Sequence, residues 1–176
     1  RDERVGADIM SDAERFSITV FGAEPRGNYN RILLSPVLSG EQQADDIMLH
    51  RPAWYSRRGI TLHSGDPIVH IDRRRRLVRS RSGVIATYDR LLIATGSDPI
   101  VLPLPGKDLP GVVTFRDLDD VNRMLERSGD GRRAVVIGGG LLGLEAAHGL
   151  SLRGMHVTVV HPMDTLMERQ LDASAG

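Results

Sequence analysis

The sequence predicts an α/β protein, and three features support that fold class. Residues 134–160 show a strand, a glycine-rich turn, a helix and a second strand in succession. Residues 68–88 contain three short runs of β-forming residues separated by polar turns, which is typical of an antiparallel meander. Residues 91–94 are apolar throughout, as expected of a strand buried on both faces of a parallel sheet.

The first third of the chain is predicted to alternate strands with loops and short helices. Residues 1–15 are polar and are interpreted as a frayed helix end. Ser17–Phe21 is β-branched and aromatic, which predicts a buried strand. The elements expected next are a loop leading into a short helix over 26–40, short helices over 45–49 and 52–58, and a strand over 60–63.

The remaining elements follow from the same periodicities. We predict meander strands at 68–72, 77–80 and 84–88, then the apolar strand 91–94 and a proline-rich connector over 100–111. Asp117 is a suitable N-cap for a helix over residues 118–127. The last predicted elements are strand 134–137, helix 141–153 and strand 157–160.

Composition excludes several classes of function. Twenty-three basic residues balance twenty-three acidic ones, so no net charge attracts nucleic acid or an anionic membrane. The chain has no cysteine, which rules out disulfides, cysteine-ligated zinc and iron–sulfur clusters within it and fits a cytoplasmic location. No apolar run approaches the ~20 residues of a membrane span. We expect no metal site, no nucleic-acid partner and no membrane partner.

The strongest local motif is AVVIGGGLLGLEAAHGLSLRGMHVTVVH, residues 134–161, which contains G-x-G-x-x-G as Gly138, Gly140 and Gly143. Its strand–turn–helix–strand context is that of a Rossmann-like dinucleotide-binding unit. The first glycine permits a sharp turn, the second leaves room for a pyrophosphate, and the third lets helix and sheet pack closely. The start of the helix, at Leu141 and Leu142, offers backbone N–H groups to the phosphates. A glycine-rich turn without a ligand is the plainer alternative.

The position that chooses between NADH and NADPH lies at the end of the second strand. It is occupied by His161, followed by Pro162. The nearest acid, Asp164, and the nearest arginine, Arg169, lie further along the loop. The cofactor choice therefore stays open.

A second nucleotide site is suggested by Glu24, which follows the predicted strand 17–21. A carboxylate after a parallel strand can bind an adenosine ribose. No glycine motif precedes it, because Gly6 is the only glycine before Gly22. Glu24 is therefore either a surface turn residue or part of an FAD site whose first strand and glycine loop lie outside this sequence.

The order of these parts resembles the FAD-dependent pyridine nucleotide oxidoreductase family, which includes rubredoxin, ferredoxin and disulfide reductases. Leu34-Ser35 is followed by Pro36, where rubredoxin-reductase-like members usually carry lysine. Within the family, several stretches look like the nitrite reductase large subunit. They are FGAEP (21–25), NYNRILLSPVLSG (28–40), ATGSDP (94–99), TFRDLDDV (114–121), GGGLLGLEAAHGL (138–150) and LMERQLD (166–172).

This resemblance implies two dinucleotide-binding domains and specific roles for their residues. Residues 1–107 would form an FAD domain and 108–176 an NAD(P) domain, both incomplete. Glu24 would hold the FAD ribose, Arg31 and Ser35 would lie along the flavin or its phosphates, and Thr95 and Gly96 would pack on FAD. The nicotinamide cofactor would be served by Gly138, Gly140, Leu141, Leu142, Gly143, Glu145 and His161. Glu145 has an equally plain interpretation as a helix-surface residue.

The implied activity is hydride transfer from NAD(P)H to FAD, feeding nitrite reduction in nitrate assimilation. The catalytic side chains are not identified. Sirohaem and an iron–sulfur cluster would belong to a parent protein, and the electrons would pass to a downstream redox domain or a small acceptor protein. The alternatives are an NAD(P)H-dependent ferredoxin or rubredoxin reductase and a non-catalytic fragment. The oligomeric state, including a homo-oligomer, stays open.

One charged run is weighed separately. Arg73–Arg76 lies between two meander strands, and no aromatic residues are interleaved with it for base stacking. We interpret it as a solvated hairpin turn rather than a nucleic-acid site.

Overall fold

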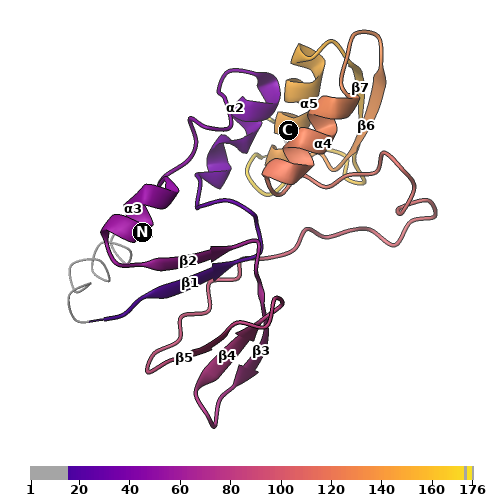
Figure 1. Cartoon of the computed structure of the whole chain (residues 1–176). Helices are drawn as coiled ribbons and strands as arrows, with labels where there is room; N and C mark the ends of the chain where they lie inside the picture. Colours follow the sequence, from indigo (N-terminus) through magenta and orange to yellow (C-terminus); the bar gives the residue numbers. More distant parts are fainter. Residues whose placement is uncertain (1–15, 173, 176) are drawn as a thin grey trace. The chain divides into compact units, whose positions relative to one another are not determined.

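A computed structural model describes residues 16–172, 174 and 175, and their packing separates into two units (Figure 1). The strand unit comprises residues 16–29 and 48–95, and the helix unit comprises residues 30–47 and the described residues from 96 onward. The predicted helix end at residues 1–15 lies outside the described residues. The chain as a whole combines helices with parallel and antiparallel strands, which confirms the predicted α/β fold class.

In the strand unit, the two strands predicted at 17–21 and 60–63 form a parallel pair. Strand β1 (Thr19–Gly22) pairs with β2 (Thr61–Ser64), with Thr19 opposite Thr61. Helix α3 (Pro52–Arg57) precedes β2 and begins with its proline in the first turn, where a missing N–H costs no helical bond. The helix is anchored by Tyr55, which is buried.

The meander of the strand unit also matches the prediction. Strands β3 (Ile68–Asp72), β4 (Leu77–Ser80) and β5 (Ile85–Thr87) form an antiparallel sheet in that order. The arginine run forms the β3–β4 turn, where Asp72 accepts the N–H groups of Arg74 at 3.0 Å and Arg75 at 2.9 Å. The run is therefore a hairpin turn, as predicted.

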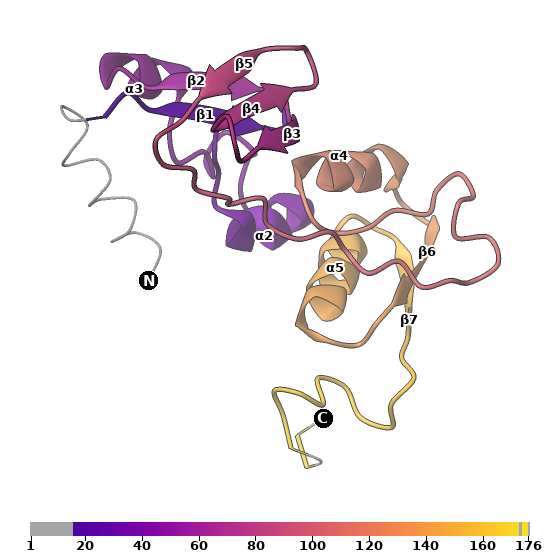
Figure 2. The same cartoon turned by 90° about the horizontal axis from the view of Figure 1, so that it is seen from below.

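The helix unit is built around a strand–helix–strand element. Strands β6 (Arg133–Ile137) and β7 (His156–Val160) are parallel, and α5 (Leu141–Leu152) connects them. Helix α2 (Leu34–Ser39) packs against α5 on one side and against α4 (Leu118–Arg127) on another (Figure 2). A short 3-10 turn, η1 (Arg31–Leu33), leads into α2. The buried apolar side chains of the three helices are Leu34, Val37, Leu38, Leu118, Val121, Met124, Ala146 and Leu150.

Local contacts explain how α2 is held against α5. Gly149 lies so close to α2 that a Cβ there would meet the Leu38 side chain at 3.0 Å. The Arg153 guanidinium, just after α5, donates to the backbone carbonyls of Leu38 at 2.8 Å and Val37 at 3.2 Å. These bonds satisfy carbonyls at the end of α2 that have no helical partner. The predicted N-cap of α4 is confirmed, because Asp117 accepts the Asp120 N–H at 2.8 Å.

Two predicted elements are wrong. Residues 45–49 form a turn rather than a helix, because Asp46 accepts the N–H of Gln43 at 3.0 Å and Met48 bridges to Tyr29 in antiparallel fashion. Residues 91–94 form no strand, since no described segment pairs with them. A parallel strand needs a neighbour for its backbone hydrogen bonds. Without one, Leu92 is 71% exposed.

Candidate functional site

The glycine turn between β6 and α5 has the geometry that a dinucleotide phosphate requires. Gly138 adopts φ +120°, which L side chains rarely adopt. A Cβ on Gly143 would lie 2.0 Å from the Gly138 carbonyl oxygen, so only glycine permits this approach. A Cβ on Gly140 would meet nothing within 4 Å, which leaves open space above the turn.

The start of α5 faces this turn with unpaired backbone donors. Gly140 is the N-cap residue and has no side chain to cap the helix. The first N–H groups of a helix, here those of Leu141 and Leu142, have no partner within the helix. Their side chains are 49% and 57% exposed. Backbone donors and the positive end of the helix dipole therefore suit an anionic group.

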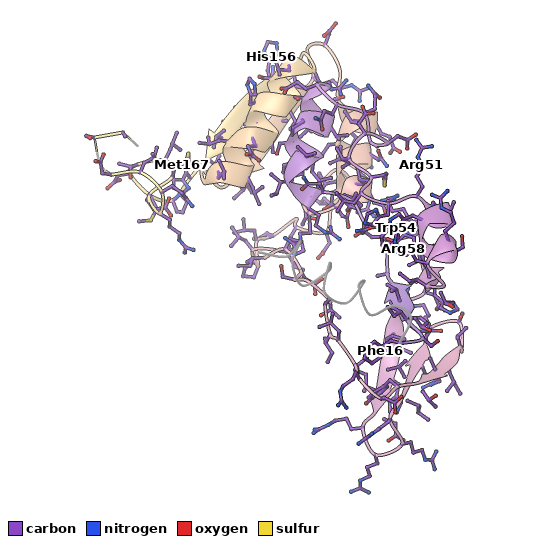
Figure 3. The ribbon with its side chains drawn as sticks, turned by 90° about the vertical axis from the view of Figure 1, so that its left-hand side faces the viewer. Phe16, Arg51, Trp54, Arg58, His156 and Met167 are labelled. Carbon is purple, nitrogen blue, oxygen red and sulfur yellow. The ribbon has the colours of Figure 1, made fainter. Side chains whose placement is uncertain are left out.

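The segment after β7 folds back onto the same turn. The Gly139 N–H donates to His161 Nδ1 at 3.0 Å, and the Met167 N–H donates to the Gly139 carbonyl at 3.0 Å. Met167, labelled in Figure 3, lies in this segment and has φ +53°. His161 Nε2 lies 3.1 Å from a carboxylate oxygen of Glu168. The structure thus brings His161 to the glycine turn and adds Glu168, which the motif did not reveal.

A second contact joins residues assigned to different cofactors. The Ser35 hydroxyl on α2 donates to Glu145 Oε2 on α5 at 2.5 Å. Ser35 was expected beside the flavin and Glu145 beside the nicotinamide cofactor. Both residues line a shallow hollow that also includes Pro36, Ser39, Glu41 and His148. Glu145 is thus half-buried and bonded to α2, and its role toward the nicotinamide cofactor stays a prediction.

The other residues expected to contact the flavin are Arg31, Thr95 and Gly96. Arg31 donates through Nη1 to the Arg116 carbonyl at 3.1 Å within the helix unit. Gly96 adopts φ +70°, and both Thr95 and Gly96 are exposed and lie outside regular elements.

Glu24 belongs to the strand unit and is engaged locally. It accepts the Tyr29 hydroxyl at 2.6 Å and forms an ion pair with Arg26 at 3.6 Å. Its side chain is 21% exposed. The Glu24 carboxylate is thus held in place after β1, and its role toward an FAD ribose stays a prediction. The contact with Tyr29 was not predicted.

His50 and Arg58, which flank α3, lie against its Trp54. His50 stacks on Trp54 with ring centroids 3.7 Å apart, and the Arg58 guanidinium lies 4.3 Å from the Trp54 ring (Figure 3). The Tyr55 hydroxyl donates to Asn28, so α3 is tied to the loop that follows β1.

The part of the chain that the structure describes holds neither a metal-binding cluster nor a membrane-spanning helix. No group of three or more His, Cys, Asp or Glu side chains there is arranged to hold a metal ion. Within the same residues, no helix has both the length and the apolar character needed to cross a bilayer.

Known bacterial proteins are similar to this chain in sequence. The chain is 49% identical over 170 residues to a Bacillus subtilis protein named nitrite reductase [NAD(P)H], covering 96% of this chain and 21% of the relative. It is 46% identical over 161 residues to the Bacillus subtilis assimilatory nitrate reductase electron transfer subunit, covering 92% of this chain and 21% of that protein. The chain therefore spans about a fifth of the length of these relatives.

Solved structures of reductases share the fold. NADH:rubredoxin oxidoreductase from Clostridium acetobutylicum matches with a TM-score of 0.79 and 27% identity, over 90% of this chain and 42% of that one. A ferredoxin reductase from Rhodopseudomonas palustris matches with a TM-score of 0.81 and 29% identity, over 94% of this chain and 41% of that one. The family model for pyridine nucleotide-disulphide oxidoreductases matches residues 6–176. This chain, with its glycine turn and parallel strand pairs, belongs to the pyridine nucleotide-disulphide oxidoreductase family.

Proposed function

We propose that this chain binds FAD and NAD(P)H and supplies electrons for nitrite reduction within a longer NAD(P)H-dependent nitrite reductase. The glycine turn is the observation that carries the proposal. Gly138 with its positive φ, open Gly140 and close-packed Gly143 together fit a pyrophosphate at the start of α5. The relatives named as nitrite reductases support the choice of acceptor.

The residues of this chain would position two dinucleotides. Backbone donors at Leu141 and Leu142 would hold the nicotinamide cofactor's pyrophosphate. Glu24 would accept hydrogen bonds from the FAD ribose. When both cofactors are bound, the chemistry they supply is hydride transfer from nicotinamide C4 to flavin N5. The contribution of the protein is alignment of the two rings.

The Ser35–Glu145 hydrogen bond gives this alignment a structural basis. It fixes α2, which follows the proposed flavin loop, against the helix that begins at the glycine turn. The proposed cofactor domains, 1–107 and 108–176, do not coincide with the packing units, since residues 30–47 pack with the second half of the chain. We keep that division as a proposal about cofactor binding, not about packing.

Absorbance spectroscopy tests the proposal directly. The purified protein carrying this chain should show a flavin band near ~450 nm that NADH or NADPH bleaches without oxygen. Gly140→Thr should weaken binding of ADP-ribose, because the side chain fills the open space over the turn. Gly22→Thr is the matched control, since a Cβ on Gly22 also meets nothing within 4 Å. A colourless protein that binds no dinucleotide would refute the proposal.

A second candidate is an NAD(P)H-dependent ferredoxin or rubredoxin reductase, which the structural likeness favours. The electron acceptor would then be a separate small protein rather than a downstream domain. Reduction of nitrite against reduction of an added ferredoxin separates the two candidates. A cytoplasmic location and a homo-oligomer stay predictions.

A further inference from the structure

We propose that Glu168 makes this chain select NADH over NADPH, by placing a carboxylate where the adenosine ribose of the dinucleotide would lie. The inference rests on the proposed binding of a dinucleotide at the glycine turn. In dinucleotide-binding folds, the residue at the end of the second strand contacts this ribose. His161 holds that position here, directly after β7 (His156–Val160).

The fold brings Glu168 back to the end of β7. His161 Nδ1 lies 3.0 Å from the Gly139 nitrogen, and its Nε2 lies 3.1 Å from Glu168 Oε2. The Met167 N–H bonds the Gly139 carbonyl at 3.0 Å. Both backbone groups of Gly139 are therefore bonded to the segment after β7, so Glu168 is tied to the glycine turn through two independent connections.

Side-chain packing at Gly139 also holds the segment after β7 against the turn. A Cβ there would lie 2.5 Å from a methyl carbon of Leu166 and 2.8 Å from His161 Cγ. Contacts this short leave no room for a side chain. The segment from His161 to Glu168 is thus packed directly against the turn that would hold the phosphates.

The hydrogen-bond partners of His161 indicate which of its two ring nitrogens carries the proton. The Gly139 N–H must donate, so His161 Nδ1 accepts and carries no proton. The proton then lies on Nε2, which donates to Glu168. The ring is held between a backbone donor and a carboxylate, and the His161 side chain is only 11% exposed while that of Glu168 is 31% exposed.

A carboxylate at this place distinguishes the two dinucleotides. It can accept a hydrogen bond from the ribose 2′-hydroxyl of NADH. The 2′-phosphate of NADPH would bring a second negative charge beside it, and like charges at short range oppose binding. The neighbouring Arg169 is the group that would favour NADPH if it, rather than Glu168, faced the ribose.

Calorimetric titration with ADP-ribose and 2′-phospho-ADP-ribose tests the inference without requiring turnover. The flavin-loaded protein carrying this chain should bind ADP-ribose at least about tenfold more tightly than its 2′-phosphorylated form. Glu168→Gln, which keeps the shape and removes the charge, should lower this ratio several-fold. Glu168→Arg should reverse it. Asp164→Asn, on the same segment, is the matched control and should leave the ratio unchanged.

The outcomes separate the two proposals. Equal binding of both ligands, preference for the 2′-phosphorylated one, or a ratio insensitive to Glu168→Gln would overturn the role of Glu168 and leave dinucleotide binding intact. Wild-type protein that binds neither ligand would overturn the proposed function itself. The ratio of kcat/KM for NADH and NADPH should follow the binding ratio in every variant.

Discussion

Gly143 offers the sharpest test of the site, because the structure predicts that one added methyl group must displace backbone. In Gly143→Ala the Cβ would lie 2.0 Å from the Gly138 carbonyl oxygen and 2.9 Å from its carbon. The first separation is about 1 Å inside the 3.0 Å limit below which real Cβ atoms essentially never lie. Both atoms are backbone, so no side-chain rotation relieves the contact.

The size of the effect follows from two opposing terms. Overpacking of this kind costs about 1–3 kcal/mol, and a rigid backbone contact favours the upper part of that range. Replacing glycine by alanine inside a helix otherwise stabilises by about 1 kcal/mol. The expected net loss is about 1–2 kcal/mol, which corresponds to a fall in Tm of about 2–8 °C for a chain of this size.

Thermal unfolding followed by circular dichroism measures this change, and ADP-ribose titration measures the accompanying loss of binding. Gly140→Thr is the control: threonine is a good N-cap, so stability should be kept while binding falls. The two variants thus distinguish a tightly packed position, Gly143, from an open position, Gly140, within one turn. A Gly143→Ala protein with unchanged or raised Tm would refute the close approach of α5 to the turn.

Three further predictions concern the rest of the chain. Ser35→Ala and Glu145→Ala, alone and combined in a double-mutant cycle on urea unfolding, should show a coupling energy of about 1 kcal/mol, because each change removes one partner of the hydrogen bond. Additive effects would contradict the bond. Leu38→Ala should destabilise the protein by about 2–5 kcal/mol in urea unfolding, since Leu38 is fully buried, whereas Leu92→Ala at an exposed site should change little. Hydrogen bonds from Ser82 and Ser80 lower the pKa of Asp66 below its usual 3.8. The stability that these bonds contribute should be complete above that pH and be lost as pH falls through the lower pKa of the folded state. Ser82→Ala should therefore flatten the dependence of Tm on pH between about 2 and 5.

The sequence predicted those elements whose determinants are local. The meander strands β3 and β4 have the predicted bounds, because turn residues and β-branched runs define them within a few positions. The capping side chain of Asp117 marks the start of α4 for the same reason. Two predictions that depended on tertiary partners were wrong: residues 45–49 are held as a turn by Asp46 and the bridge at Met48, and residues 91–94 have no neighbouring strand among the described residues.

At the site, too, local features could be predicted from the sequence and contacts between distant residues could not. The roles suggested for Gly138, Gly140 and Gly143 follow from a motif whose spacing is local, and the geometry of the turn fits each of them. The contact between Ser35 and Glu145 joins positions 110 residues apart and has no local signature. Only the family resemblance singled out these two residues, and it assigned them to different cofactors rather than to each other.

Glu168 shows why a short distance in sequence does not make a contact predictable. It lies seven residues after His161, a separation at which a loop can point in any direction. Its return depends on Gly139, whose missing side chain admits both Leu166 and the imidazole. The glycine that the motif leaves unspecified is therefore the residue that brings a carboxylate to the turn. Gly139→Ala should displace the imidazole and Glu168 together, and we expect it to reduce the preference for ADP-ribose over its 2′-phosphorylated form while the three motif glycines remain in place.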